Sequence, residues 1–180
     1  MANPLTARGQ FDWLVHAAGA RPPVRFDPSD SAAVRSLARR GAPLKIGAAA
    51  IALLAGRSDA LAAFEECLDH ALSALVMYDD FSDWRDDADA GRWNAFVAFA
   101  GGTRDKTMLA LLLGRERAYA NRIRDEAMAA AGLVTQFGCP ALANHLRAFA
   151  RRANCEFAEG RRQNRQRTIR ATELLFGIAS

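Results

Sequence analysis

The residues with the clearest chemical potential are aspartates near the middle of the chain, in the acidic segment formed by residues 79–92. Asp79, Asp83 and Asp87 follow one another at intervals of four residues, and Asp80 flanks them. On a continuous α-helix such residues share one face, over about 12 Å of the axis. Carboxylate oxygens suit Mg²⁺, which keeps coordination positions for substrate phosphates. The spacing therefore predicts a magnesium site formed by these four aspartates.

Apolar residues upstream indicate the direction of this face. At helical spacing before Asp79 the same stripe carries Val76, Leu72 and Leu68. The carboxylates are therefore expected to point into the protein, where they repel one another and lose solvation unless a cation compensates. The alternative is a solvated acidic helix end, capped by Arg85 and Arg92.

Helical patterns also cover the sequence before the acidic segment. A short amphipathic helix is expected around residues 11–18, and Asp30 or Ser31 is expected to cap a second one. A buried helix is predicted from Leu44 to Ala55, with Gly56 as its stop. The next helix is predicted to start after Ser58 or Asp59 and to run through the acidic segment to Gly91.

The second half of the chain shows the same helical spacing, and no strand pattern competes with it. Thr103 is a candidate cap for one helix. After a turn at Gly138–Pro140, a helix is expected over Leu142–Phe157, followed by a last one around Ile169–Phe176. The chain is therefore predicted to be one all-α domain, residues 1–180, built as a bundle of about six or seven helices.

The composition limits the class of protein. No uncharged apolar run reaches about 18 residues, so no membrane span is expected. The start of the chain shows no signal-peptide pattern, which favours a cytoplasmic location. The three cysteines are far apart and are expected to be reduced thiols. The arginine-rich stretch from Arg151 to Arg170 lacks interleaved aromatics apart from Phe157. A solvated helix face is therefore favoured there over basic residues that close the diphosphate end of a pocket and over nucleic-acid binding.

Two strings resemble motifs of class I isoprenoid synthases, the superfamily of trans-prenyltransferases (polyprenyl synthetases), squalene and phytoene synthases, and terpene cyclases. Asp79-Asp80-Phe81-Ser82-Asp83 matches their DDxxD pattern, and the string from Asp83 to Arg92 resembles DxxEDxxxGR. Upstream, Lys45-Ile46-Gly47-Ala48-Ala49 resembles the KTGAL element that precedes the second aspartate motif of trans-prenyltransferases.

The resemblance covers about a third of the chain and implies both a fold and a site. The implied fold is the isoprenoid-synthase bundle. In the implied site, Asp79, Asp80, Asp83 and Asp87 hold Mg²⁺, while Lys45 and Arg92 contact the diphosphate of a prenyl substrate. The implied activity is prenyl transfer or terpene cyclisation. Only the second of the family's two facing metal motifs is present, so the chain resembles the C-terminal half of the fold.

Two main functions of different kinds therefore stay open, beside a weaker third, a small helical regulator that uses its arginine-rich end. One is a Mg²⁺-dependent prenyltransferase or terpene synthase. The other is a non-catalytic partner subunit or degenerate half-fold homologue, with a homodimer or a partner subunit supplying the second half. The half-fold hypothesis predicts a large exposed apolar patch where that half would pack.

Overall fold

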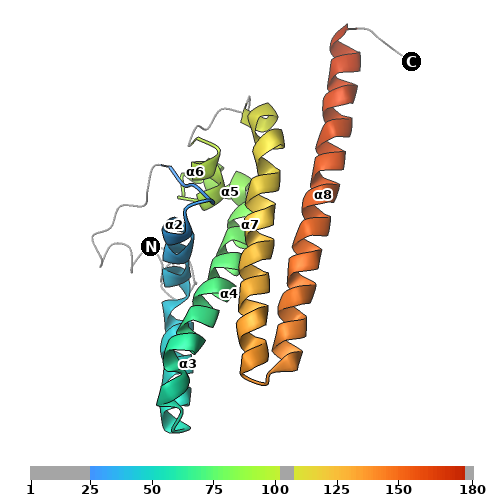
Figure 1. Cartoon of the computed structure of the whole chain (residues 1–180). Helices are drawn as coiled ribbons and strands as arrows, with labels where there is room; N and C mark the ends of the chain where they lie inside the picture. The colour runs from blue at the N-terminus through green and yellow to red at the C-terminus, as the bar shows by residue number, and fades with distance from the viewer. Residues whose placement is uncertain (1–24, 102–107, 177–180) are drawn as a thin grey trace.

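The chain forms an all-α bundle in the computed structural model, which describes residues 25–101 and 108–176. All regular structure within these residues is helical, which confirms the predicted fold class. The long helices α4 (Leu61–Ser82), α7 (Met108–Gln136) and α8 (Pro140–Phe176) run side by side, and α3 (Ala42–Leu54) lies at the edge of the bundle (Figure 1). In the described part of the chain no helix is both long and apolar enough to cross a membrane.

Short helices complete the bundle around α4. The remaining elements are α2 (Ser31–Ser36), the 3-10 turn η1 (Leu37–Gly41), the 3-10 turn η2 (Ser58–Ala60), α5 (Trp84–Asp89) and α6 (Ala95–Phe99). The helix expected around residues 11–18 and the cap expected at Thr103 lie outside the described residues.

The main core lies where α4, α6, α7 and α8 meet, and it is rich in aromatic rings. Tyr119 of α7 is fully buried, and its ring centroid lies 5.1 Å from that of Phe96 in α6. Phe81 of α4 stacks on Phe157 of α8, with 3.8 Å between the ring centroids. The first contact fixes α6 against α7, and the second fixes the end of α4, which carries the acidic segment, against α8.

The N-terminal end of the described chain follows the sequence prediction closely. Asp30 caps α2 by accepting hydrogen bonds from the backbone N–H groups of residues 32 and 33. Val34 and Leu37 are buried, as expected. The Ser73 hydroxyl of α4 donates to the carbonyl of Val34 over 3.0 Å, which anchors α2 to the long helix.

The prediction of two separate helices after Pro140 was wrong, because α8 is continuous from Pro140 to Phe176. The only helix-weakening residue inside it is Gly160, and a single glycine costs a helix only about 1 kcal/mol. The Gly138 turn that begins this element is confirmed, with φ +69° at that glycine.

The prediction that residues 44–55 form a buried helix was right about the helix and wrong about its burial. Gly56, with φ +70°, ends α3 as expected. No residue of α3 is buried, however, and its large apolar side chains are mostly exposed: Leu44 65%, Ile46 71%, Ile51 71%, Leu53 56% and Leu54 90%. Apolar composition predicted burial, but among the described elements α3 packs mainly against α4 and the two 3-10 turns, which leaves its other side exposed.

Candidate functional site

The long helix of the acidic segment is interrupted in its middle. α4 ends at Ser82, Asp83 adopts φ −102° and ψ 7°, and α5 begins at Trp84. The Ser82 hydroxyl donates back to the carbonyl of Tyr78 over 2.9 Å, a contact typical of bent or ending helices. The continuous helix predicted up to Gly91 was therefore wrong, although the N–H groups of Asp83 and Asp87 still donate to the carbonyls of Asp79 and Asp83 across the break. The three side chains differ in burial: Asp79 is exposed, Asp83 is half-buried and Asp87 is buried.

Asp80 is the most deeply buried carboxylate of the segment, with 1% of its surface exposed. Arg40 donates from Nη1 to its Oδ1 over 2.6 Å, and the backbone N–H of Ala95 donates to its Oδ2 over 2.9 Å. Burial raises the pKa of Asp80, and the Arg40 charge and these hydrogen bonds oppose that rise only in part. The carboxylate thus joins the end of η1, the end of α4 and the start of α6.

Asn94 is the hub of the second half of the segment, and it is also buried. Its side-chain oxygen caps α6 by accepting from the N–H groups of Phe96 and Val97. Its Nδ2 donates to the carbonyl of Asp80 over 2.7 Å and to Oδ2 of Asp87 over 2.8 Å. One amide therefore holds α4, α5 and α6 together.

Asp87, 3% exposed, is closed off from its other side by Arg92. Arg92 donates from Nε to Oδ1 of Asp87 over 2.8 Å, and its backbone N–H donates to the Asp87 carbonyl. The predicted metal ligand and the predicted diphosphate contact are therefore paired with each other. The pair closes the turn that follows α5, where Gly91 has φ +66°.

These contacts decide how well the segment suits Mg²⁺ in this arrangement. Both oxygens of Asp80 and both oxygens of Asp87 accept hydrogen bonds from protein donors. Mg²⁺ needs oxygens turned toward it in near-octahedral geometry, so these two buried carboxylates do not fit as ligands. Asp79 is exposed and Asp83 is half-buried, one helical turn apart at the end of α4. Among the described residues no group of three or more acidic, His or Cys side chains could hold a metal ion.

Lys45 lies away from the acidic segment. Its Nζ is 2.6 Å from Oδ1 of Asp69 and 3.4 Å from Oε1 of Glu65. Burial lowers the pKa of Lys45, but the two carboxylates outweigh it, and the net shift is upward. Asp69 precedes Asp79 by ten residues on α4, which is about 15 Å along the axis. The structure therefore does not bring the predicted diphosphate-binding lysine together with the aspartates.

Sequence reasoning missed three residues that define this region. Asn94 carried a readable signal, because asparagine directly before an apolar run is a preferred N-cap. Arg40 carried none, since its partner Asp80 is 40 residues away in sequence. The hydroxyl of Tyr119 has no hydrogen-bond partner among the described residues. Burial raises the pKa of this hydroxyl well above its usual value, and the nearby charge of Asp80 adds to the rise.

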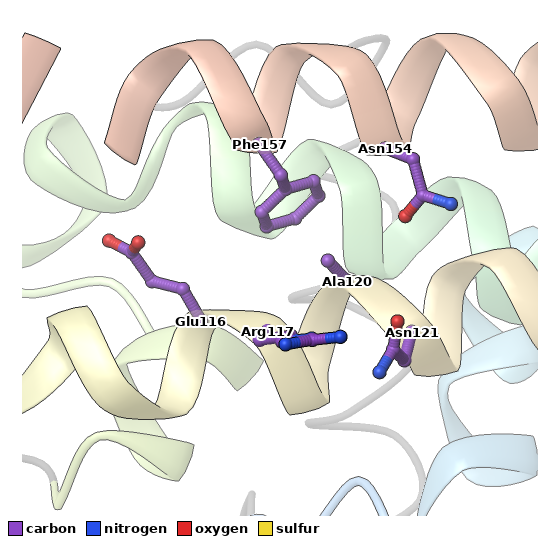
Figure 2. Close-up of a pocket in the computed structure, with 6 residues that line it drawn as sticks. All are labelled: Glu116, Arg117, Ala120, Asn121, Asn154 and Phe157. Carbon is purple, nitrogen blue, oxygen red and sulfur yellow. The ribbon is translucent and has the colours of Figure 1, made fainter. Parts of the chain in front are cut away.

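A small pocket of about 160 Å³ lies between α7 and α8. Figure 2 shows Phe157 and Asn154 of α8 pointing toward α7. The pocket is lined by Glu116, Arg117, Ala120, Asn121, Asn154 and Phe157, which include none of the predicted site residues. Pockets for organic ligands usually measure about 300–1,000 Å³, so a prenyl chain does not fit this one. Its connection to the acidic segment is the stack of Phe157 on Phe81.

No protein-family model, no curated protein and no solved structure matches this chain.

Proposed function

We propose that this chain works as a helical assembly subunit, which docks through the exposed face of α3 onto a second helical surface and has no chemistry of its own. The observation that carries the proposal is the exposure of α3. Its exposed residues, in chain order, are Pro43, Leu44, Ile46, Gly47, Ala50, Ile51, Leu53 and Leu54, all of them apolar. A contiguous apolar surface of this kind marks an interaction site.

The energy available from this face is of the size that association needs. Full burial of a leucine or isoleucine side chain stabilises by about 1.5–3 kcal/mol. The five large side chains of α3 are between 56% and 90% exposed, so covering them releases about 5–10 kcal/mol. Association costs about 4–15 kcal/mol in lost freedom. The exposed face of α3 therefore supports an association of moderate affinity, provided that residues around α3 are also buried in the interface.

The state of the acidic segment supports the same proposal. A metal-dependent synthase needs several carboxylates that converge on open space, whereas Asp80 and Asp87 each spend both oxygens on protein donors. In this proposal their role is to seat α5 and α6 on the end of α4. The resemblance to half of the isoprenoid-synthase fold fits a unit that presents one helical surface to a second body.

Photo-crosslinking at two leucines tests the proposal. The crosslinker p-benzoylphenylalanine replaces Leu54 of α3, which is 90% exposed, or Leu142 of α8, which is 48% exposed and serves as the control. We expect an abundant intermolecular adduct from position 54 and little from position 142 when the chain is irradiated in its native cells. Equal yields from the two positions, or no intermolecular adduct from position 54, would contradict the proposal.

Magnesium-dependent binding of a prenyl diphosphate is the second candidate. It is favoured by one observation, the placement of Asp79 and Asp83 one turn apart at the end of α4, with Asp79 exposed. Titration calorimetry of wild type and Asp79→Asn with a farnesyl diphosphate analogue, with and without Mg²⁺, tests it. Heat that requires both Mg²⁺ and Asp79 supports this candidate, and identical traces for the two proteins reject it.

A further inference from the structure

The pocket between α7 and α8 is a polar site within a mostly apolar helix interface. Among the described side chains of α8, the buried ones are all apolar: Ala143, Leu146, Phe149, Ala150, Ala153 and Phe157. The lining of the pocket differs, because most of its residues carry polar groups: Glu116, Arg117, Asn121 and Asn154. The other two lining residues, Ala120 and Phe157, are buried and give the pocket an apolar wall.

Two amide side chains of the pocket have hydrogen-bonding groups that the protein does not use. Asn121 of α7 and Asn154 of α8 are half-buried, and neither side chain has a hydrogen-bond partner among the described residues. Figure 2 shows Asn154 extending from α8 toward α7, on the side of the pocket where Asn121 lies. Each amide offers two N–H donors and a carbonyl acceptor. Asn94, in contrast, uses both ends of its amide within the fold, so the pocket amides are the ones available to a ligand.

The pocket also contains one negative and one positive side chain. Glu116 is buried and extends from α7 on the side of α8 (Figure 2), whereas the next residue, Arg117, is exposed. Arg117 forms no ion pair with any described residue. The two charges limit the class of ligand, because the carboxylate repels a simple anion and the guanidinium repels a simple cation. A small molecule that carries both charges matches both side chains.

The volume of the pocket sets the size of the ligand. The pocket measures about 160 Å³. A protein cavity of about 150 Å³ holds one molecule of benzene. The ligand is therefore expected to be no larger than benzene, which excludes nucleotides, sugars and lipid chains.

We propose that this pocket binds a small α-amino acid, such as glycine or alanine, in its zwitterionic form. The ammonium group of the ligand pairs with Glu116, and its carboxylate accepts from Arg117 and from the amide of Asn154. Its short carbon part packs on Ala120 and Phe157. Because so small a ligand makes few contacts, its dissociation constant is expected in the millimolar range. The site shares no residue with α3, so it stands or falls independently of the proposed assembly role.

NMR titration of the full chain with glycine tests the proposal. Acetate and methylamine serve as probes that each lack one of the two charges. We expect glycine to cause saturable shifts of the side-chain amide signals of Asn121 and Asn154. Acetate and methylamine should each bind at least about tenfold more weakly, since each leaves one charged side chain of the pocket without its partner on the ligand.

A matched pair of asparagine variants locates the binding. Asn154→Ala removes one unused amide, whereas Asn144→Ala makes the same change at an exposed position of α8 outside the pocket. Because Asn154 has no partner within the described chain, its loss is expected to leave the fold intact. Asn154→Ala should bind glycine at least about tenfold more weakly, as reported by the Asn121 signal, and Asn144→Ala should bind it as the wild type does.

Three outcomes overturn the proposal. Glycine that causes no saturable shifts shows that the pocket takes no amino acid. Acetate or methylamine that binds as tightly as glycine shows that only one of the two charges is recognised. Equal glycine binding by Asn154→Ala and wild type places the glycine elsewhere on the protein. If circular dichroism shows that Asn154→Ala has lost helix, Arg117→Gln, at an exposed residue, takes its place with the same weakening expected.

Discussion

The acidic segment and helix α3 invert the usual relation between sequence and environment. The acidic segment is strongly polar, yet Asp80 and Asp87 are almost fully buried, as is the neighbouring Asn94. Helix α3 is strongly apolar, yet none of its residues is buried. The difference lies in the neighbours of each region. The buried carboxylates of the acidic segment accept hydrogen bonds from donors within the chain, whereas neighbouring elements cover only one side of α3.

The contrast shows that the type of a residue does not by itself tell whether its side chain is available for binding. The four aspartates resemble a set of metal ligands. Two of them, Asp80 and Asp87, instead accept hydrogen bonds that connect neighbouring helices. The leucines and isoleucines of α3 look like an ordinary core, but they are the surface that remains available for binding. The following experiments break or sharpen this comparison, from the largest expected effect to the smallest.

Removing the buried carboxylate is expected to have the largest effect. Asp80→Ala removes the carboxylate that pairs with the largely buried Arg40 and accepts from the N–H of Ala95, and breaking a buried pair in this way costs about 3 kcal/mol. Urea unfolding measures the loss. The neighbouring Asp79→Ala, on an exposed side chain, is the control and should change the free energy of unfolding by no more than about 0.5 kcal/mol. Equal effects at the two positions would refute the structural role of Asp80.

Removing the hub amide is expected to have the next largest effect. Asn94→Ala deletes the cap of α6 and also the donor to Asp80 and Asp87, which together cost about 2 kcal/mol. Thermal and urea unfolding both report this loss. Asn144→Ala, at an exposed asparagine of α8, is the matched control and should be nearly neutral. A neutral Asn94→Ala would mean that α6 is held by its apolar contacts alone.

The pH dependence of stability gives a smaller and signed effect. Because the pKa of Asp80 is raised in the folded state, the folded protein binds this proton more tightly than the unfolded chain. The resulting stabilisation is complete below the ordinary value of 3.8 and is lost as pH rises through the raised value. The destabilisation caused by Asp80→Asn, measured by urea unfolding, should therefore be larger at acid pH than at neutral pH. The opposite trend would show that Arg40 outweighs burial.

The smallest effect is expected on the exposed face of α3. Leu54→Gln should change the free energy of unfolding of the dilute, monomeric protein by no more than about 0.5 kcal/mol, since the side chain is 90% exposed. Leu72→Ala, at a position that is 6% exposed, is the buried comparator and should cost about 2–5 kcal/mol. A large loss from Leu54→Gln under these conditions would show that α3 is covered within the single chain.

Local features were predictable from the sequence, and most of the expected helices with their ends were found. Asp30 capped α2, Gly56 ended α3 and Gly138 opened the turn before α8, because caps and left-handed glycines act over a few residues. The break at Asp83 was missed. Beside this break, Asp80 accepts a hydrogen bond from the N–H of Ala95 at the start of α6, a contact that the pattern of a single helix does not predict.

What the sequence determined by itself was the all-α class, the apolar character of α3 and the clustering of aspartates on the end of one helix, because these follow from residue type and spacing. Only the tertiary structure decided which aspartates are buried and which side of α3 stays open. That decision depends on residues far apart in the chain, such as Arg40 with Asp80 and Lys45 with Asp69, which meet only when the helices pack. A periodic pattern gives each helix its faces, but the number of neighbours that cover those faces is set by the whole fold.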